Sequence, residues 1–393
     1  MIATPSAERV EVVCLGESMV TFVPSRPGPL ADVPSFHRAI GGAESNVACT
    51  LARAGHRTRW VSRVGADGFG DHLVDTIAAA GVDVGAVQRD PHRPTGVYFR
   101  TAQERSTTLS GGSGRAEVVY YRKGSAASAL SPDLVRRQDV WSGDVLHLTG
   151  ITGALSATCH ALMTRLTHRE PGRPLVSFDV NHRPALWRDA DPLDLVALAR
   201  GCDLVFVGED EAQAAFGLPD ADAVRAALPE PAVLVVKQGA DGATVFASEG
   251  ALLPGGPGAS GAPGAPEGAA ASQGVDGPVG PDRAVGSDRP GAVGGGDVRL
   301  HVPAPVVDVV AHVGAGDAFA AGFLSATLRG LPLRDRMRHG HLLAAAALTV
   351  PDDLAVPPGR ERCDALAALD DAAWGALRLG PGWARDATGG GTP

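Results

Sequence analysis

Apolar segments that alternate with amphipathic ones in the middle of this 393-residue chain constrain its fold more than any other feature. Each apolar segment has the length of a strand, and each following segment has the spacing of a helix. Strands that are apolar along their whole length are typical of a parallel sheet covered by helices on both faces, so an α/β fold is predicted. The predicted strands are 144–149, 175–180, 203–207 and 232–236, and the predicted helices lie near 156–168, 191–200, 209–216 and 221–228.

The N-terminal third combines the same pattern with shorter, alternating strands. A buried first strand at 12–15 ends at Gly16-Glu17. Short alternating segments at 18–24 and 33–40, and an aromatic hairpin formed by 95–101 and 116–122, fit a small sheet outside the main one. A β-lid from about 18–40 and 95–123 is therefore predicted over a site. The same third contains a predicted helix at 47–54, a strand at 58–64 and a helix at 69–80.

One internal segment differs from the rest in composition. Residues 250–297 are dominated by Gly, Pro, Ala and Ser and lack aromatic residues, so a disordered insertion is predicted, with a functional linker as the alternative. The flanking segments 243–246 and 298–302 could pair across it. Helices at 333–349 and 361–376 close a single domain at 8–378, and residues 379–393 are expected to form a flexible tail.

Charge and cysteine usage exclude several classes of protein. The formal net charge is −9 and no basic run occurs, so neither a nucleic acid nor a membrane surface is expected as a partner. The five cysteines are widely spaced, which indicates reduced thiols rather than a zinc site or a disulfide framework. No signal peptide or membrane-spanning apolar run is recognisable, and a cytoplasmic location is expected.

The turn Gly314-Ala315-Gly316-Asp317 carries the strongest chemical signal. A β-branched strand is predicted at 305–310 before the turn, and a helix that ends before Gly330 follows it. Free N–H groups at a helix start attract anions, and the helix dipole adds positive potential. Asp317 beside a bound phosphate is interpreted as a catalytic base. The alternative is a plain helix start that Asp317 caps.

Two further glycine-containing segments indicate ligand contacts. Gly41 and Gly42 allow a close approach of the backbone, and Asn46 can hydrogen-bond to hydroxyl groups, although a tight turn with Asn46 at a helix start is the alternative. Lys237 ends an apolar strand, where it suits a nucleotide phosphate or is simply a solvated strand end. Gly239 and Gly242 follow it and leave room for the nucleotide.

These motifs together resemble the ribokinase-like (PfkB) carbohydrate kinases. Gly41-Gly42 with Asn46, Ala48, Gly55 and Gly65 is similar to the family's first signature, 314–317 to its second, and 237–242 to its nucleotide loop. The resemblance implies a three-layer α/β/α fold with a mainly parallel sheet and a β-lid. It implies phosphorylation of a sugar hydroxyl with ATP and Mg²⁺. Asp317 would then be the base, and the N–H groups of Gly314, Ala315 and Gly316 would stabilise the transferred phosphoryl group.

A second set of residues resembles the branch of the family that phosphorylates 2-keto-3-deoxygluconate at its C6 hydroxyl. The resemblance implies that the sugar acid is bound by Tyr98, Tyr120, Arg122, Arg183 and Asp353. Guanidinium groups match a carboxylate in planar, bidentate geometry. The alternatives are lid packing for the tyrosines, surface charges for the arginines and turn capping for Asp353.

Metal binding follows the family pattern only in part. The resemblance implies that Glu211 orders Mg²⁺ through water, although Gly208 stands where an Asn is usual; a first-turn helix residue is the alternative. Ala311 and His312 replace the usual Asp-Thr before the anion turn, which leaves activation by a monovalent cation doubtful.

Two other functions compete with a sugar-acid kinase. One is a fructokinase or ribokinase-like kinase of a neutral sugar, and the other is a non-catalytic sugar or nucleotide sensor on the same fold. By analogy with the family, the lid could also form a homo-oligomer interface.

Overall fold

The computed structural model describes residues 9–26, 28–101, 118–188, 191–248, 298–351 and 354–385. Its central sheet has eight strands in the order β14-β13-β12-β11-β10-β9-β1-β4. Every neighbouring pair from β12 to β4 is parallel, and β13 and β14 add an antiparallel edge. The strands are β1 (Val12–Leu15), β4 (Thr58–Val61), β9 (Val145–Thr149), β10 (Leu175–Asp179), β11 (Leu204–Gly208), β12 (Val233–Lys237), β13 (Ala243–Ala247) and β14 (Val298–Val302).

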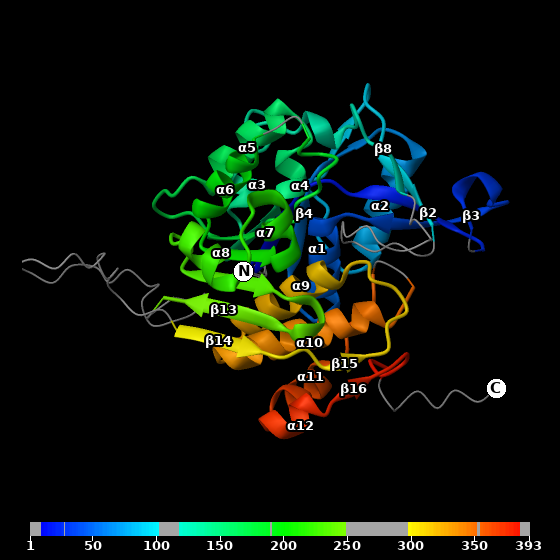
Figure 1. The fold of residues 1–393 in the computed structure, drawn as a ribbon. Coiled ribbons are helices and arrows are strands. Elements are labelled where there is room, and N and C mark those ends of the chain that lie inside the picture. Colours follow the sequence, from blue (N-terminus) through cyan, green and yellow to red (C-terminus); the bar gives the residue numbers. More distant parts are fainter. Residues whose placement is uncertain are drawn as a thin grey trace, which may run out of the picture.

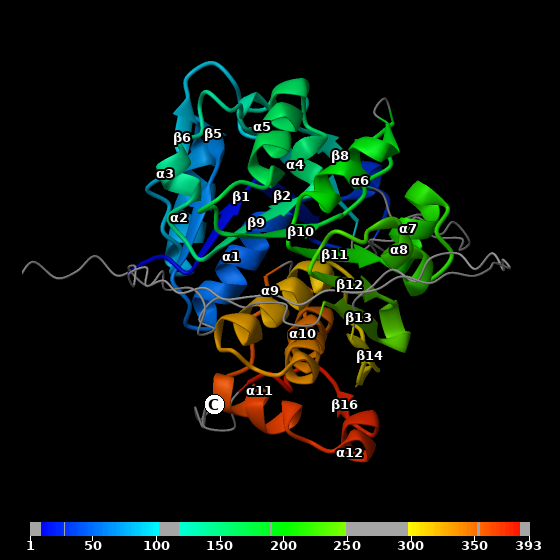
Figure 2. The same cartoon turned by 90° about the vertical axis from the view of Figure 1, so that its left-hand side faces the viewer.

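Helices cover both faces of this sheet, which confirms the predicted three-layer α/β/α architecture (Figures 1 and 2). One face carries α1 (Ala43–Arg53), α2 (Gly68–Ala79), α9 (Ala315–Leu328), α10 (Leu333–Leu348), α11 (Arg360–Ala367) and α12 (Asp371–Gly375). The other carries α3 (Arg137–Val140), α4 (Gly150–Gly153), α5 (Ala157–Thr167), α6 (Pro192–Arg200), α7 (Glu209–Phe216) and α8 (Ala221–Ala227).

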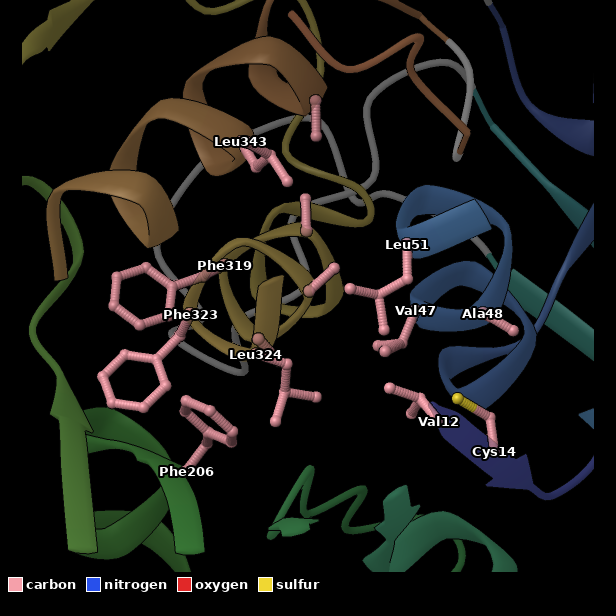
Figure 3. Packing of buried hydrophobic residues seen from close by; sticks show 14 of the residues in the cluster. Val12, Cys14, Val47, Ala48, Leu51, Phe206, Phe319, Phe323, Leu324 and Leu343 are labelled. Atoms are coloured by element: carbon pink, nitrogen blue, oxygen red, sulfur yellow. The ribbon is translucent and has the colours of Figure 1, made fainter. Parts of the chain in front are cut away.

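Side chains that point alternately to the two faces of the sheet form two hydrophobic cores, one on each face. Phe206 of β11 packs edge-on against Phe319 and Phe323 of α9, as Figure 3 shows. Its neighbours Val205 and Val207 belong to the core on the opposite face. Successive side chains of a strand point to opposite faces, so a strand buried on both sides must be apolar throughout. This explains why the central strands were recognisable in the sequence.

The lid is a separate four-stranded sheet with the order β3-β2-β7-β8, and it lies beside the main body in Figure 1. Its strands are β2 (Met19–Pro24), β3 (Phe36–Gly41), β7 (Val97–Arg100) and β8 (Val118–Tyr121). The antiparallel pairing of β7 with β8 places Tyr98 opposite Tyr120. The predicted lid hairpin is therefore confirmed in the described residues.

Several predicted boundaries were wrong, and each error has a local cause. The strand expected at 58–64 divides at Ser62 into β4 and β5 (Arg63–Gly65), and β5 pairs with β6 (Gln88–Asp90) outside the main sheet. The helix expected from 47 already begins at Ala43 as α1. The helix expected at 361–376 divides because the Asp370 carboxylate accepts a hydrogen bond from the Ala373 N–H and starts α12.

The strand expected at 305–310 was the largest error. Only β15 (Val306–Val307) forms, and it pairs with β16 (Arg378–Leu379) in a two-stranded sheet of its own. Val309 and Val310 are exposed. Because a strand needs a partner along its length, a β-branched run facing a two-residue partner stays extended without becoming a longer strand.

The predicted insertion at 250–297 lies outside the described residues, as does the tail from 386. On either side of the insertion, β13 and β14 pair in antiparallel register from Ala243 with Val302 to Ala247 with Val298, as predicted. Leu379, the first residue of the expected tail, is buried in β16. None of the helices described here has the length and apolarity needed to cross a membrane.

Candidate active site

Most of the predicted site residues converge at the carboxyl end of the central sheet. Asp179 ends β10, Gly208 ends β11 and Lys237 ends β12, and the amino end of α9 lies against them. The carboxyl ends of parallel strands share one edge of a sheet, and ligands of open α/β folds bind there. The lid strands and the amino end of α1 contribute the remaining residues.

The glycine turn is itself the first turn of α9. Gly314 adopts a left-handed backbone with φ 74° and caps a helix that begins at Ala315. Ala318 N–H donates to Gly314 O at 2.9 Å, which closes the first helical hydrogen bond. The preceding N–H groups of Ala315, Gly316 and Asp317 have no intrahelical acceptor because of this geometry. They lie, with the positive end of the helix dipole, at the end of α9 that adjoins Lys237.

Asp317 is oriented by Asn46 of α1. Asn46 Nδ2 donates to Asp317 Oδ2 at 2.9 Å. The pKa of Asp317 is raised to about 7, mainly by burial and in part by repulsion from Asp179. The Asn46 hydrogen bond, Arg183 and Lys237 lower it. A carboxyl group with a pKa near neutrality is suited to act as a general base at physiological pH.

Lys237 is held in an ion pair. Its Nζ donates to both carboxylate oxygens of Asp179, at 3.0 and 2.8 Å. Burial disfavours the charged amine, yet Asp179, Glu211 and Asp317 together raise the pKa of Lys237. A methyl group placed on Gly316 would lie 3.4 Å from Nζ, so the ammonium adjoins the anion turn.

Glu211 and Arg183 lie next to this pair. Gly208 N–H donates to Glu211 Oε2 at 3.2 Å, and Arg183 Nη1 is 3.6 Å from Glu211 Oε1. Burial raises the pKa of Glu211, while Lys237 and Arg183 oppose that effect. Asn181, two residues before Arg183, has a positive φ of 41°, which bends the chain just after β10.

The lid contributes an aromatic pair and an arginine. The Tyr98 and Tyr120 rings are tilted, with centroids 5.4 Å apart, and the Arg122 guanidinium lies 5.6 Å from the Tyr120 ring centre. Tyr98 is buried, whereas Tyr120 is 43% exposed. Arg122 forms an ion pair with the buried carboxylate of Glu17. Tyr98 and Tyr120 therefore lie side by side on β7 and β8, and Arg122, which follows β8, lies next to Tyr120.

Several glycines of the predicted site occupy positions where a side chain would clash or the backbone conformation would be strained. A methyl group on Gly42 would lie 2.4 Å from Glu17 O, so only glycine fits between α1 and the segment after β1. Gly41 is the last residue of β3. Gly242 has φ 121°, and a methyl group there would lie 2.3 Å from Val302 O. Gly242 is thus required by packing against β14, and Gly239, with φ 61°, by the turn itself.

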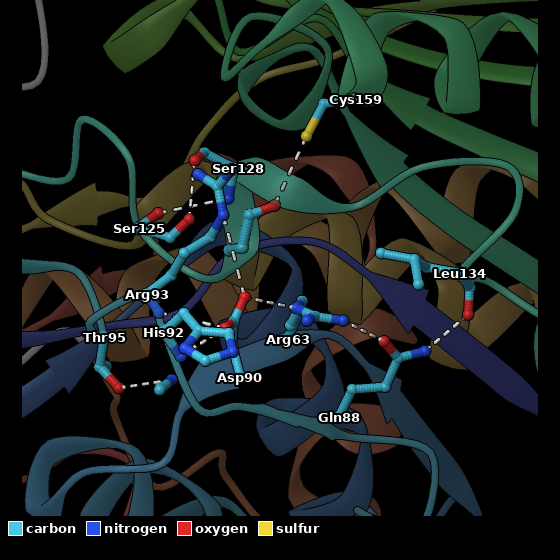
Figure 4. Close-up of polar contacts among 12 residues, drawn as sticks. Arg63, Gln88, Asp90, His92, Arg93, Thr95, Ser125, Ser128, Leu134 and Cys159 are labelled. Carbon is cyan, nitrogen blue, oxygen red and sulfur yellow. Dashed lines mark hydrogen bonds and ion pairs between the residues drawn. The ribbon is translucent and has the colours of Figure 1, made fainter.

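The base of the lid is fixed by a polar network around Asp90 (Figure 4). The Asp90 carboxylate accepts hydrogen bonds from Arg63 Nε at 2.9 Å and from the N–H groups of His92 and Arg93. Thr95 Oγ1 then accepts from Gly65 N at 2.9 Å, just before β7 begins. Hydrogen bonds therefore hold the segment that precedes the strand carrying Tyr98.

Three buried carboxylates of the site were missed by sequence reasoning. Asp179 appeared only within the predicted strand 175–180, and Glu17 only at the end of the first strand. Glu44 of α1 is buried, and its Oε1 accepts hydrogen bonds from Thr149 and Thr152 at 2.8 and 2.7 Å. Burial raises the pKa of Glu44 to about 7. The only available signal was a Glu beside predicted apolar segments, which alone indicates a surface position.

Asp353 and the loop before the anion turn are the remaining predicted features of the site. Asp353 lies outside the described residues. Ala311, just before the anion turn, is held by the end of α10, where its N–H donates to Leu348 O at 3.2 Å. Neither Ala311 nor His312 brings a carboxylate to this loop, so the sequence departure stands in the structure.

The start of α9 can hold a phosphate, and beside it lies a carboxyl group with a pKa near neutrality. Together with a lid that can cover a sugar, these features define a sugar-phosphorylating class of enzyme. Family comparison agrees, because residues 9–258 and 285–357 match the model of the pfkB family carbohydrate kinases. The chain belongs to this family and is a carbohydrate kinase with an ATP-utilising fold, as the motifs at 41–46, 237–242 and 314–317 indicated.

Curated relatives include two sugar-acid kinases and several fructokinases. The 2-dehydro-3-deoxygluconokinase of Bacillus subtilis (strain 168) is 32% identical over 90% of this chain and 94% of its own length. That of Thermoproteus tenax is 37% identical over 63% of this chain and 75% of its own length. The probable chloroplastic fructokinase-6 of Arabidopsis thaliana is 26% identical over 88% of this chain and 79% of its own.

Solved structures show the same fold. A PfkB protein from Polaromonas sp. JS666 superposes with a TM-score of 0.67 and 29% identity, covering 91% of this chain and 99% of its own. The sugar kinase PH1459 from Pyrococcus horikoshii, solved in complex with ATP, superposes with a TM-score of 0.67 and 20% identity, covering 93% of this chain and 100% of its own.

Proposed function

We propose that the enzyme transfers the γ-phosphoryl group of ATP to the C6 hydroxyl of 2-keto-3-deoxygluconate, giving the 6-phosphate. One observation carries the proposal. Tyr98, Tyr120 and Arg122 meet on the lid, and Arg122 Nε is buried without a hydrogen-bond partner among the described residues. A buried N–H group of a guanidinium needs an acceptor, and a sugar carboxylate supplies one. The names of the two 2-dehydro-3-deoxygluconokinase relatives support the same substrate.

The sugar acid is bound between the lid and the strand ends. Arg122 and the two tyrosines contact the carboxylate end from the lid, Arg183 approaches from the end of β10, and Asp353 is assigned to the sugar by the family motif alone. Gly41, Gly42 and Asn46 border the sugar from the junction of β3 and α1. The arginines already have carboxylate partners, Glu17 and Glu211, so they recognise the acid by directional hydrogen bonds rather than by net positive charge.

Phosphoryl transfer follows from the arrangement of Asp317 and the α9 turn. Asp317 accepts the proton of the C6 hydroxyl while the C6 oxygen forms its bond to the γ-phosphorus and the bond to the bridging oxygen of ADP breaks. The N–H groups of Gly314, Ala315 and Gly316 stabilise the charge on the transferred group. Lys237, beside Gly316, contacts the phosphates, and Asn46 fixes the carboxylate that receives the proton.

Magnesium enters with ATP as part of the substrate. The Glu211 carboxylate suits it through water, since it lies at this edge with one backbone hydrogen bond and a distant arginine as partners. Mg²⁺ retains much of its hydration shell in such sites, and it neutralises phosphate charge. The turn at Gly239 and Gly242 borders the nucleotide.

A coupled assay of ADP release over a panel of sugars and sugar acids tests the proposal. Signal with 2-keto-3-deoxygluconate and Mg²⁺, lost in Asp317→Asn and weakened in Arg122→Ala, is expected. Activity confined to neutral sugars would overturn the substrate assignment, as would an Arg122→Ala variant with unchanged activity on the sugar acid.

A neutral-sugar kinase is the second candidate. The ion pair between Arg122 and Glu17 leaves no net positive charge at that point of the lid, and fructokinases occur among the relatives. Fructose and ribose in the same panel distinguish the two. A variant Arg122→Ala with intact fructose phosphorylation would favour this candidate.

A further inference from the structure

Glu17 lies where three segments proposed to bind the sugar meet. It follows β1 of the central sheet, and its side chain is 0% exposed. Its backbone oxygen faces Gly42 of the sugar-binding turn, where a methyl group would lie 2.4 Å away. Its Oε1 faces Gly96, just before β7, where a methyl group would lie 3.1 Å away. A side chain on Gly42 would clash with Glu17, and one on Gly96 would crowd it.

The two oxygens of the Glu17 carboxylate bind Ser125 and Arg122, which both follow β8. Oε1 accepts a hydrogen bond from Ser125 Oγ at 2.6 Å. Oε2 pairs with Arg122 Nη2, and the Arg122 side chain is 10% exposed. Ser125 is in turn fixed, because its backbone oxygen accepts from Ser128 Oγ at 2.7 Å (Figure 4). A carboxylate anchored in the body thus holds the arginine that follows β8.

This contact decides how Arg122 can meet a ligand. A guanidinium is planar and presents its N–H groups along fixed edges. With Nη2 held by Glu17, rotation of the group is restricted, and the buried Nε remains without a partner among the described residues. An isolated buried charge is costly, so the ion pair offsets part of the cost of burying Glu17 and Arg122.

We propose that Glu17 is a positioning residue that fixes the Arg122 guanidinium, so that its remaining N–H groups face the carboxylate of the sugar acid. The role rests on the proposed function, because it requires that Arg122 binds substrate. Glu17 acts through Arg122 and does not touch the reacting atoms. Loss of its charge frees Arg122 to reorient, which weakens sugar binding and leaves ATP binding unchanged.

A double-mutant cycle on Glu17 and Arg122 tests the proposal. Glu17→Gln keeps the shape and removes the charge, and it is expected to raise KM for 2-keto-3-deoxygluconate about tenfold or more. KM for ATP stays within about twofold. In the Arg122→Ala background the same substitution is expected to have no further effect on the sugar KM. Glu17→Asp, which retains the charge, should restore part of the affinity.

Controls separate this role from a structural one. Glu361→Gln in α11, an exposed position, should leave both KM values unchanged. Additive effects of Glu17→Gln and Arg122→Ala on the sugar KM would overturn the proposal, as would an equal rise in KM for ATP. If the unmodified enzyme ignores sugar acids, the proposed function fails instead, and the cycle is then run with its preferred sugar. Additivity there would refute the positioning role independently.

Discussion

Asp317 is a half-buried carboxyl group that must lose its proton to act as a base. Its pKa is raised to about 7, so the fraction of ionised base changes around neutral pH. We predict that kcat/KM rises with pH through about 7 and then levels. Because the Asn46 hydrogen bond lowers the pKa of Asp317, Asn46→Ala should move this limb to higher pH and reduce the plateau. A pH–rate profile of both proteins checks it; an unmoved limb would contradict the assignment of Asp317 as base.

The same carboxyl group should lower stability at alkaline pH. Its folded pKa lies above the ordinary value of 3.8, so the folded state binds this proton more tightly than the unfolded state. The stabilisation is therefore complete below pH 3.8 and is lost as the pH rises through about 7.

Asp317→Asn removes this penalty together with the base. We predict that the free energy of unfolding at pH 8 is about 1–3 kcal/mol higher for the variant than for the unmodified enzyme, a range that allows for partial solvent access. Its activity is expected to fall ~10²–10⁴-fold. The stability difference should shrink towards pH 4. Thermal unfolding at the two pH values measures it. Equal melting temperatures of the two proteins at pH 8 would show that ionised Asp317 does not destabilise the folded state.

At the scale of elements, a strand could be predicted from the sequence where it packs against neighbours on both faces. The strands from β9 to β12 are buried on two faces, and that burial is visible as unbroken apolar sequence. The run 305–310 has the same composition, but its partner β16 is two residues long, and nothing in the run itself reveals that. The start of α9 at Ala315 was also obscured, because glycine is unfavourable inside a helix and suggested a longer turn.

The first turn of α9 distinguishes an anion site from a plain helix start. A methyl group on Gly316 would lie 3.4 Å from Lys237 Nζ, an ordinary contact, so Gly316→Ala fits the folded chain. Alanine favours a helix by about 0.5–1 kcal/mol over glycine. We predict unchanged or higher stability together with at least about tenfold lower kcat, because the methyl group occupies the space beside the phosphates.

Parallel measurements of unfolding and of ADP release check this separation. Gly314→Ala is the matched comparison, since its left-handed φ of 74° makes alanine strained there. It should lose about 1 kcal/mol of stability. Full activity in Gly316→Ala would mean that the turn merely starts the helix.

At the scale of the whole molecule, the site is built from charge pairs that the fold brings together. Asp179 with Lys237, and Glu17 with Arg122, are far apart in sequence, and each member alone is typical of a surface residue. Sequence motifs located the glycine turns and Asp317 because their spacing is local. The carboxylates that orient the cationic residues became visible only when the strands were placed side by side.

The organisation of the whole chain also predicts that residues 249–297 are dispensable. The family match is interrupted between 258 and 285, and Ala247 pairs directly with Val298 across the segment. Replacing 249–297 by one glycine leaves Ser248-Gly as a two-residue connection, a length that suits an antiparallel hairpin. Closing a shorter loop costs less entropy, by roughly 2–3 kcal/mol for a change from about 50 residues to two. We therefore expect an equal or higher melting temperature, with kcat and both KM values within about twofold. Because Gly242 and Lys237 lie at the opposite end of the β13–β14 pair, a selective rise in KM for ATP would instead show that the segment takes part in nucleotide binding.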